Sequence, residues 1–158
     1  MVTSTMNNIT KEDVYKLLEW VVDPEIPVLT VFDLGIIRDV NILETGVEVV
    51  ITPTYSGCPA MFMIEAQIKA ALIEGGIRDV TIRTVLSPAW TTDWITEEGR
   101  AKLEKFGIAA PRERDHNPSC PRCASSNTTL LSQFGSTACK ALWQCLDCKE
   151  PFDYFKCH

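Results

Sequence analysis

The segments Cys120-Pro121-Arg122-Cys123 and Cys145-Leu146-Asp147-Cys148 decide how the C-terminal part of this 158-residue chain can fold. Each segment is a CxxC pair, and 21 residues separate the two pairs. Pairs at this spacing are typical of zinc sites, in which four thiolates surround one ion as a tetrahedron. About 40 residues are too few for an apolar core alone to hold a fold. The sequence therefore predicts a β zinc-ribbon domain over residues 119–158, with a structural metal bound by Cys120, Cys123, Cys145 and Cys148.

The identity of this metal is open to two interpretations. A closed set of four thiolates leaves no position for a substrate, which favours structural zinc, but a rubredoxin-like iron site uses the same ligands. Residues 128–132 and 141–144 are predicted to be strands of the ribbon, with residues 134–136 at or near the turn. Cys139, Cys157 and His158 are secondary ligand candidates, and Cys139 is equally compatible with a small buried side chain.

The seven cysteines are distributed unevenly, since six lie in the last 39 residues and Cys58 stands alone before them. An odd number of cysteines with CxxC spacing indicates metal binding in a reducing compartment rather than a secreted disulfide module. No stretch reaches the roughly 18 consecutive apolar residues of a membrane span, and the first ten residues lack the pattern of a signal peptide. We therefore expect a cytoplasmic protein without a membrane partner.

The composition is that of a globular protein, with 46% hydrophobic and 23% charged residues. The formal net charge of −6 argues against non-specific binding of nucleic acid. Residues 112–158 carry six basic and five acidic side chains, so the predicted ribbon is no basic patch either. Its aromatic residues are explained most simply as a compact core beneath the metal, and alternatively as an exposed docking patch: Trp143, Phe152, Tyr154 and Phe155.

Residues 1–110 are predicted to form a small α+β domain, an α/β sandwich that folds on its own apolar core. Apolar residues at helical spacing and alternating β-branched residues define its elements. The predicted helices span residues 11–22, 59–74 and 95 or 96 to 106, and the predicted strands span 36–42, 47–51 and 79–86. Gly46, between the first two strands, is available for a positive φ in a hairpin turn. Residues 111–118 are polar and bounded by prolines, which indicates a linker.

Cys58 lies in the loop Gly57-Cys58-Pro59, directly before the second predicted helix. Unpaired amides and the helix dipole at a helix N-terminus favour an anion, so this cysteine is predicted to be a functional thiolate. The alternative is a buried and inert side chain. Acidic residues of the first loop could approach it, or could belong to a solvated acidic surface: Asp23, Glu25 and Asp33.

Four short stretches carry a resemblance to a known family: residues 23–27 (DPEIP), 33–37 (DLGII), 52–53 (TP) and 57–59 (GCP). Together they resemble the MIP18 (DUF59) family of iron–sulfur assembly factors, over residues 10–106. The resemblance implies a MIP18-like sandwich fold with Cys58 as the reactive residue and Glu25 in the same loop cluster. It implies iron or a transient iron–sulfur cluster as cargo, and the candidate ligands are Cys58, Glu25 and, because it lies in the same loop, Asp23. Many relatives lack a cysteine-rich tail, so their behaviour need not transfer unchanged.

Three later stretches are more specific: residues 94–100 (WITEEGR), 134–142 (FGSTACKAL) and 151–158 (PFDYFKCH). They look like the family of D subunits, also called J, of bacterial phenylacetyl-CoA ring-epoxidase systems, and this resemblance spans nearly the whole chain. It implies a role in aerobic phenylacetate degradation. The implied partners are the oxygenase subunits, which include a di-iron protein, and a flavin and iron–sulfur reductase.

Two functions of different classes follow from these observations. The first is a non-catalytic maturation protein in which Cys58 helps to bind or transfer iron or a cluster, with the ribbon as a docking module. The second is a stoichiometric subunit of the oxygenase complex in which Cys58 is merely structural. A thiol enzyme is disfavoured because the two histidines, His116 and His158, lie in the predicted linker and at the chain end. Cys58 could hold a cluster alone, across a homodimer, or together with Cys139 or Cys157.

Overall fold

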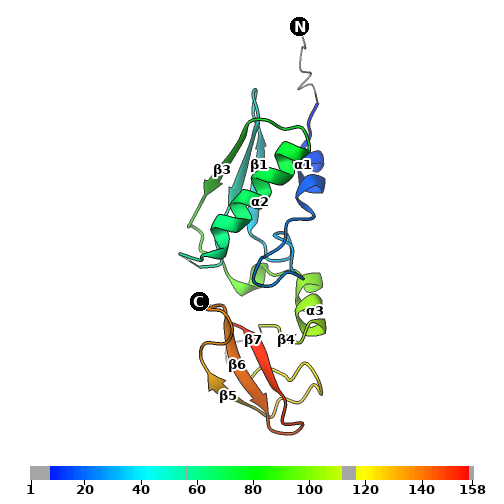
Figure 1. Ribbon diagram of the computed structural model, residues 1–158, viewed down its shortest axis with the longest axis vertical. Helices are drawn as coiled ribbons and strands as arrows, with labels where there is room; N and C mark the ends of the chain where they lie inside the picture. The colour runs from blue at the N-terminus through cyan, green and yellow to red at the C-terminus, as the bar shows by residue number, and fades with distance from the viewer. Residues whose placement is uncertain (1–7, 56, 112–116, 157–158) are drawn as a thin grey trace. The chain divides into compact units, whose positions relative to one another are not determined.

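The computed structural model describes residues 8–55, 57–111 and 117–156, which belong to two compact units. The first unit runs to Trp90 and the second begins at Thr91 (Figure 1). Each unit contains one sheet, with strand order β1-β2-β3 in the first and β4-β7-β6-β5 in the second. The predicted fold class, a small α+β sandwich with a C-terminal β ribbon, is confirmed.

The first unit consists of a three-stranded sheet with two helices packed on one face (Figure 1). Strands β1 (Ile37–Ile42) and β2 (Val47–Ile51) are antiparallel, and β3 (Val80–Thr84) is parallel to β2. Helices α1 (Lys11–Leu18) and α2 (Ala60–Glu74) cover one face of the sheet, to which alternate residues of the strands direct their apolar side chains. The core lies between the two layers and includes the buried side chains Val40, Val49, Ile51, Leu18, Ile64, Ile68 and Leu72.

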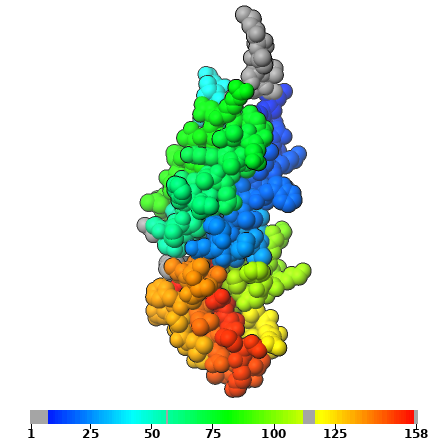
Figure 2. All heavy atoms as spheres, viewed as in Figure 1, coloured from blue at the N-terminus to red at the C-terminus, as the bar shows by residue number. Residues whose placement is uncertain are grey.

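Helix α2 has one face in the core and one at the surface of the first unit. Its outer side chains make up much of the surface of this unit in the space-filling view (Figure 2). Phe62 and Met63 are among the exposed large apolar residues, whereas Ile64 and Ile68 are buried. The helix is therefore apolar on more than its core-facing side, which is why periodicity alone does not define its orientation sharply.

Two glycines allow close backbone packing in the first unit. A Cβ added at Gly46, in the β1–β2 turn, would lie 2.1 Å from the Asp79 carbonyl oxygen. A Cβ added at Gly75, where α2 ends, would lie 2.4 Å from Leu17 Cδ1 of α1. We expected Gly46 to supply a positive φ, but the positive-φ glycines of the described chain do not include it. Glycine is therefore required at position 46 because a side chain would collide with Asp79, and not because the backbone there has a positive φ.

The first helix ends at Leu18, four residues earlier than predicted, because the following residues form backbone hydrogen bonds with the next loop. Val31 N donates to Val21 O at 3.0 Å, and Asp23 N donates to Leu29 O at 2.9 Å. Val22 and Thr30 form an isolated antiparallel bridge between them. Because of this pairing, the chain is extended at residues that the apolar periodicity alone predicts to be helical.

The second unit is a β ribbon joined to one helix. Strands β5 (Thr128–Ser132), β6 (Lys140–Cys145) and β7 (Pro151–Phe155) are antiparallel neighbours, and β4 (Ile108–Ala109) pairs in parallel with β7. Helix α3 (Glu97–Lys105) follows the short 3-10 helix η1 (Thr92–Trp94). The Arg100 guanidinium of α3 donates to Thr92 O and Pro111 O at 2.8 and 2.5 Å. The two strands predicted for the ribbon are present, whereas β4 and β7 were not predicted.

The compact units are divided at a different place from the predicted domains. We predicted residues 1–110 as one domain, 111–118 as a linker and 119–158 as the ribbon. In the structure α3 and β4 belong to the second unit, and β4 is held there by its pairing with β7. Residues 112–116, most of the predicted linker, lie outside the described residues, so the linker remains a prediction.

Candidate functional site

The four predicted metal ligands of the ribbon converge on one point. The Sγ atoms of Cys120, Cys123, Cys145 and Cys148 all lie within 4.8 Å of one another. Two of the distances are 3.7 Å, between Cys120 and Cys148, and 3.6 Å, between Cys123 and Cys145. Zinc–sulfur bonds of about 2.3 Å at tetrahedral angles require about 3.8 Å between sulfurs. Two of the distances are already close to this value, so these thiols, the four-cysteine site, suit a tetrahedral metal ion.

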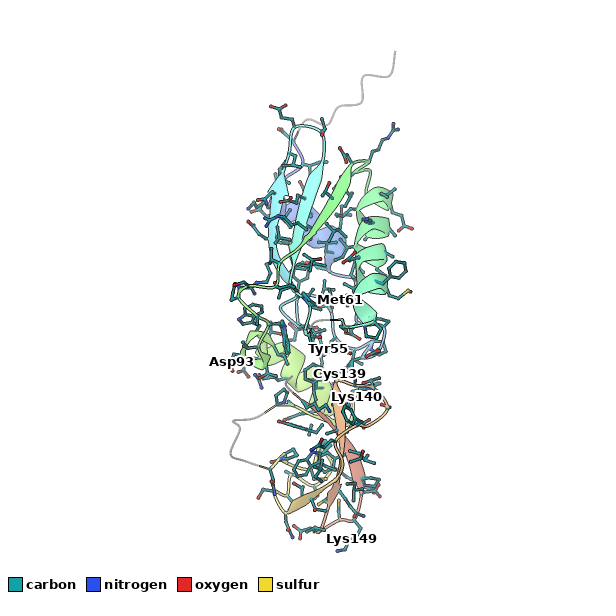
Figure 3. The ribbon with its side chains drawn as sticks, turned by 90° about the vertical axis from the view of Figure 1, so that its left-hand side faces the viewer. Tyr55, Met61, Asp93, Cys139, Lys140 and Lys149 are labelled. Atoms are coloured by element: carbon teal, nitrogen blue, oxygen red, sulfur yellow. The ribbon has the colours of Figure 1, made fainter. Side chains whose placement is uncertain are left out.

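The same backbone turn presents each pair of ligands. Cys120 N donates to Ser125 O at 2.9 Å, and Cys145 N donates to Glu150 O at 3.0 Å, so each first cysteine bonds to the carbonyl five residues later. The residue directly after the second cysteine of each pair has a positive φ, 62° at Ala124 and 67° at Lys149. Lys149 lies at one end of the ribbon (Figure 3). Both turns thus direct two thiols to one side.

A carboxylate links the two turns outside the thiols. Asp147 lies between the second pair of cysteines, and its carboxylate accepts hydrogen bonds from the Ser125 hydroxyl and from Asn127 Nδ2, the latter at 2.9 Å. These hydrogen bonds, Ser125 first, lower the pKa of Asp147. Arg122 and Glu150 add a salt bridge between the turns. Sequence reasoning missed these partners, although polar residues inside and just after CxxC pairs are a signal for them.

The thiols of the site differ in their ease of ionisation. The Cys148 backbone N–H donates to Cys145 Sγ and lowers the pKa of Cys145 to about 7. The Ser125 backbone N–H lowers the pKa of Cys123, but the hydrogen bond with Cys145, burial and the other thiols outweigh it and raise this pKa to about 12. Each thiol thus changes the pKa of its neighbours, because the thiols are hydrogen-bonded to one another. Four thiolates can be ionised together only with a cation among them.

An apolar cluster lies beneath the site. Buried Ala109, Cys120, Cys145 and Phe152 pack together, with Trp143, Cys148 and Tyr154 against them. The rings of Trp143 and Tyr154 make an edge-to-face contact with centroids 6.2 Å apart. These residues form a compact core under the metal ligands, while Phe155 is buried elsewhere in the ribbon.

The secondary ligand candidates do not join this site within the described residues. Cys139 is buried, and its Sγ lies 3.0 Å from Thr137 Oγ1. In the described part of the chain, the four CxxC cysteines are the only group of three or more potential metal ligands that lie together. Cys157 and His158 lie outside the described residues, as does His116, so their predicted roles stay untested.

Cys58 lies in the first unit, directly before Pro59, the N-cap of α2. Its N–H donates to Tyr55 O at 3.3 Å, and its carbonyl accepts from Met61 N at 3.1 Å, so the loop turns tightly into the helix. Gly57 has a φ of 80°, a conformation that glycine adopts without strain. Tyr55 and Met61 lie at this end of α2 (Figure 3). The half-buried Cys58 is therefore held at the helix N-terminus, as predicted from the sequence.

A hollow of about 230 Å³ adjoins Cys58, and residues from α2, β3 and the loops on either side line it. Glu65 of α2 supplies the charged group of the lining. Its carboxylate accepts a long hydrogen bond of 3.5 Å from the Thr84 hydroxyl. The complete lining is Pro53, Gly57, Cys58, Met61, Glu65, Thr84 and Leu86.

The acidic residues predicted near Cys58 do not line this hollow. Asp23 Oδ1 accepts from the backbone N–H groups of Glu25 and Ile26 at 2.7 and 2.9 Å, and Asp33 Oδ2 accepts from Thr30 N at 2.9 Å. Asp23 and Asp33 are buried and stabilise the turns of their own loop. Glu25, which follows Asp23 closely, is half-buried. The predicted part of Glu25 and Asp23 in a ligand set with Cys58 remains a proposal.

Comparison with known proteins assigns each part of the chain to a described domain. A model of an iron–sulfur cluster assembly protein matches residues 11–83, and a model of the PaaD zinc beta ribbon domain matches residues 108–156. A protein of Escherichia coli (strain K12), named as the D subunit of a 1,2-phenylacetyl-CoA epoxidase, is 49% identical over 92% of both chains. The chain belongs to this D-subunit family.

Shorter proteins match the N-terminal part of this member of the D-subunit family. An Fe-S protein maturation auxiliary factor of Porphyromonas gingivalis (strain ATCC BAA-308 / W83) is 39% identical, over 60% of this chain and 90% of its own. A solved DUF59 domain from Bacillus anthracis matches with 25% identity and a TM-score of 0.54, over 58% of this chain and 89% of its own. The expected resemblance to DUF59 proteins is thereby confirmed, and the ribbon is an addition to that domain.

One feature of this D-subunit family member was not foreseen from the sequence. Glu65 shares the hollow with Cys58, and it follows Cys58 by seven residues, two turns of an α-helix. This helical spacing was a usable signal, because residues seven apart lie on one face of a helix.

Among the described residues no helix is long and apolar enough to cross a membrane.

Proposed function

We propose that this protein is a non-catalytic accessory protein of a phenylacetyl-CoA epoxidase system, which assists the assembly of iron or an iron–sulfur cluster in the oxygenase or its reductase. The observation that carries the proposal is the position of Cys58. A half-buried thiol borders a hollow of about 230 Å³, within the residues that match the iron–sulfur cluster assembly model. The names of the relatives support both halves of the proposal, the oxygenase context and the maturation role.

In this role the Cys58 thiolate would hold the cargo, iron or a cluster, and release it to a client protein. The thiol gives its proton to solvent as the sulfur–iron bond forms, and that bond breaks as a ligand of the client binds the iron. No change of oxidation state is required for this transfer. Glu25, taken from the resemblance, and Asp23, taken from its position in the first loop, remain the ligand candidates. Asp23 would have to bind through Oδ2, because its Oδ1 accepts the hydrogen bonds from Glu25 N and Ile26 N.

The four-cysteine site has a different role in the proposal. All four positions of a tetrahedral ion are occupied by thiolates, so a metal there stabilises the ribbon and leaves no position for cargo. We assign zinc to it, because residues 108–156 match a zinc beta ribbon model, and the sulfur–sulfur distances suit a tetrahedral ion with four thiolate ligands. The ribbon then serves as a docking module for the oxygenase subunits or the reductase.

The test is to express the oxygenase and reductase with either the wild-type protein or the Cys58→Ala variant. We expect the clients to contain less iron or fewer clusters, and to be less active, when Cys58 is replaced. Cys139→Ala is the matched control, because it removes another cysteine that is not part of the four-cysteine site. Full cluster content and full activity with Cys58→Ala would contradict the proposal.

A second candidate is a stoichiometric structural component of the oxygenase complex, without any transfer of iron. The naming of the Escherichia coli relative as a subunit favours it. Two results would support this candidate over the first. The protein should purify with the oxygenase at equal stoichiometry, both as wild type and as Cys58→Ala. The oxygenase and its reductase should contain complete clusters when they are produced without this protein.

A further inference from the structure

We propose that Glu65 is the second protein ligand at Cys58, and that the two side chains bind one ferrous ion in the hollow between α2 and β3. This inference rests on the proposed function, because it names the ligand set of the same cargo. It differs from the sequence-based expectation, which placed Glu25 and Asp23 beside the thiol. The carrying observation is that Cys58 and Glu65 line one hollow of about 230 Å³.

The polypeptide places both groups on one side of α2. Cys58 precedes the helix, while Met61 and Glu65 follow it by three and seven residues, positions that recur on one helix face. All three line the same hollow. Glu65 is held by the helix, and Cys58 is tied to its first turn by the hydrogen bond from Met61 N to the Cys58 carbonyl, so the placement of the pair does not depend on a long loop.

The charges in the hollow favour a cation. Glu65 is the one charged residue of the lining, and within the described part of the chain it forms no salt bridge. Its side chain is half-buried, and the Thr84 hydroxyl at 3.5 Å is a weak partner for its carboxylate. The Cys58 thiol releases its proton when its sulfur binds a metal ion, which places a thiolate beside the Glu65 carboxylate. A divalent ion neutralises both charges.

A second buried polar group lies in the chain directly before the lining of the hollow, although it is not itself part of that lining. Thr52 is 1% exposed, and its Oγ1 has no hydrogen-bond partner among the described residues. Thr52 directly precedes Pro53, which lines the hollow. A buried hydroxyl without a partner is unusual in a native protein, and often indicates a bound water or ion.

The donor types indicate the class of ion. Thiolate and thioether sulfur favour soft or borderline transition metals over magnesium or calcium, and a carboxylate oxygen is compatible with ferrous iron. Two protein ligands leave the remaining positions of the ion open to water or to ligands of a client. Such an open site suits an ion that is bound reversibly and then released, unlike the closed four-cysteine site.

The experiment is an anaerobic titration of the full chain with Co²⁺, followed by the thiolate-to-cobalt charge-transfer absorption, with zinc content measured to verify that the ribbon stays loaded. Fe²⁺ is then used to compete with Co²⁺. We expect the absorption to disappear in Cys58→Ser. We expect Glu65→Gln to weaken Co²⁺ binding by about tenfold or more, and Glu65→Asp to restore part of the affinity. Glu74→Gln, at the C-terminal end of α2 and outside the lining of the hollow, is the matched control and should leave the affinity unchanged, while Glu25→Gln tests the first loop as the alternative ligand.

The outcomes separate this inference from the proposed function. Binding that depends on Cys58 but is unchanged in Glu65→Gln would overturn the inference and leave the proposed function intact. Weaker binding in Glu25→Gln together with normal binding in Glu65→Gln would also overturn it, in favour of the first loop. If no absorption depends on Cys58, both the inference and ion binding by Cys58 are wrong. Circular dichroism of each variant verifies that the affinity change is not a loss of fold.

Discussion

The Sγ atom of Cys123 lies 3.6 Å from that of Cys145, although the two residues belong to different CxxC pairs and differ completely in exposure. Cys145 is fully buried, whereas Cys123 is exposed. One edge of the four-cysteine site therefore connects the apolar core of the ribbon to its surface. A metal ion bound by these thiols would join the two turns and stabilise a segment that is too short to fold on an apolar core alone.

Replacement of a ligand should abolish metal binding, whereas replacement of another buried cysteine should not. We expect about one zinc per wild-type chain, and less than about a tenth of that in Cys145→Ser. Cys139→Ser is the control, since Cys139 directly precedes β6 but is outside the four-cysteine site. Elemental analysis of the purified proteins measures the result. Iron in place of zinc in aerobically purified wild type would contradict the assignment.

Removal of the metal should unfold the ribbon and leave the first unit folded. The first unit has its own core between the sheet and helices α1 and α2, while the apolar cluster of the ribbon includes two of the metal ligands. Hydrogen exchange after treatment with a chelator should therefore rise in β5, β6 and β7 and stay slow in β2 and α2. Equal protection in all of these elements after complete loss of metal would exclude a structural role for the ion.

Asp147→Ala should weaken metal binding without removing a ligand. The variant loses the hydrogen bonds from Ser125 and Asn127 that link the two turns, so the thiols are less well pre-organised. We expect a loss of affinity of roughly tenfold, at the lower end of the effect of outer-sphere partners. Competition with a chromogenic chelator measures the affinity, and Asp153→Ala, on β7, serves as the control. Equal affinities for the two variants would exclude a positioning role for Asp147.

Gly46→Ala should destabilise the first unit. The added methyl group would meet the Asp79 carbonyl oxygen at 2.1 Å, so the turn or the start of β3 must move, which costs about 1–3 kcal/mol. Thr45→Ala, at the neighbouring position, removes only an exposed hydrogen bond to Asp79 and should cost much less. Urea denaturation of both variants, followed by circular dichroism, gives the free energies of unfolding. Equal values would mean that the turn adapts to the methyl group.

The ion pair between Lys11 and Asp39 should make the attachment of α1 to the sheet dependent on pH. The Lys11 hydrogen bond is the main cause that lowers the pKa of Asp39 below its ordinary value of 3.8. The resulting stability is present above pH 3.8 and is lost as the pH falls through the lower pKa of the folded state. Lys11→Met should raise the pKa of Asp39 towards 3.8. Titration by NMR measures it, with Asp13, whose pKa Thr10 lowers, as an internal control that should not change.

Local patterns were sufficient for most of the secondary structure. The β1–β2 hairpin and α2 lie within one residue of their predicted ends, because alternation and helical spacing of apolar residues are strong over those stretches. Strands β4 and β7 were missed for different reasons. β4 has two residues, too few for any pattern, and the aromatic residues of β7 were explained as core without an assigned element.

The sequence by itself determined the four-cysteine site, because CxxC spacing restricts which atoms can meet and one metal ion satisfies all four thiols. It also determined that Cys58 lies at a helix N-terminus, since proline and glycine mark that boundary locally. Only the tertiary structure decided which carboxylate shares the hollow with Cys58. Asp23 and Asp33 hold their own loop, whereas Glu65 lines the hollow, because the packing of α2 against β3 selects one side of the helix. The spacing of seven residues makes Glu65 a candidate, but the choice between Glu65 and the acidic residues of the first loop depends on contacts that are distant in sequence.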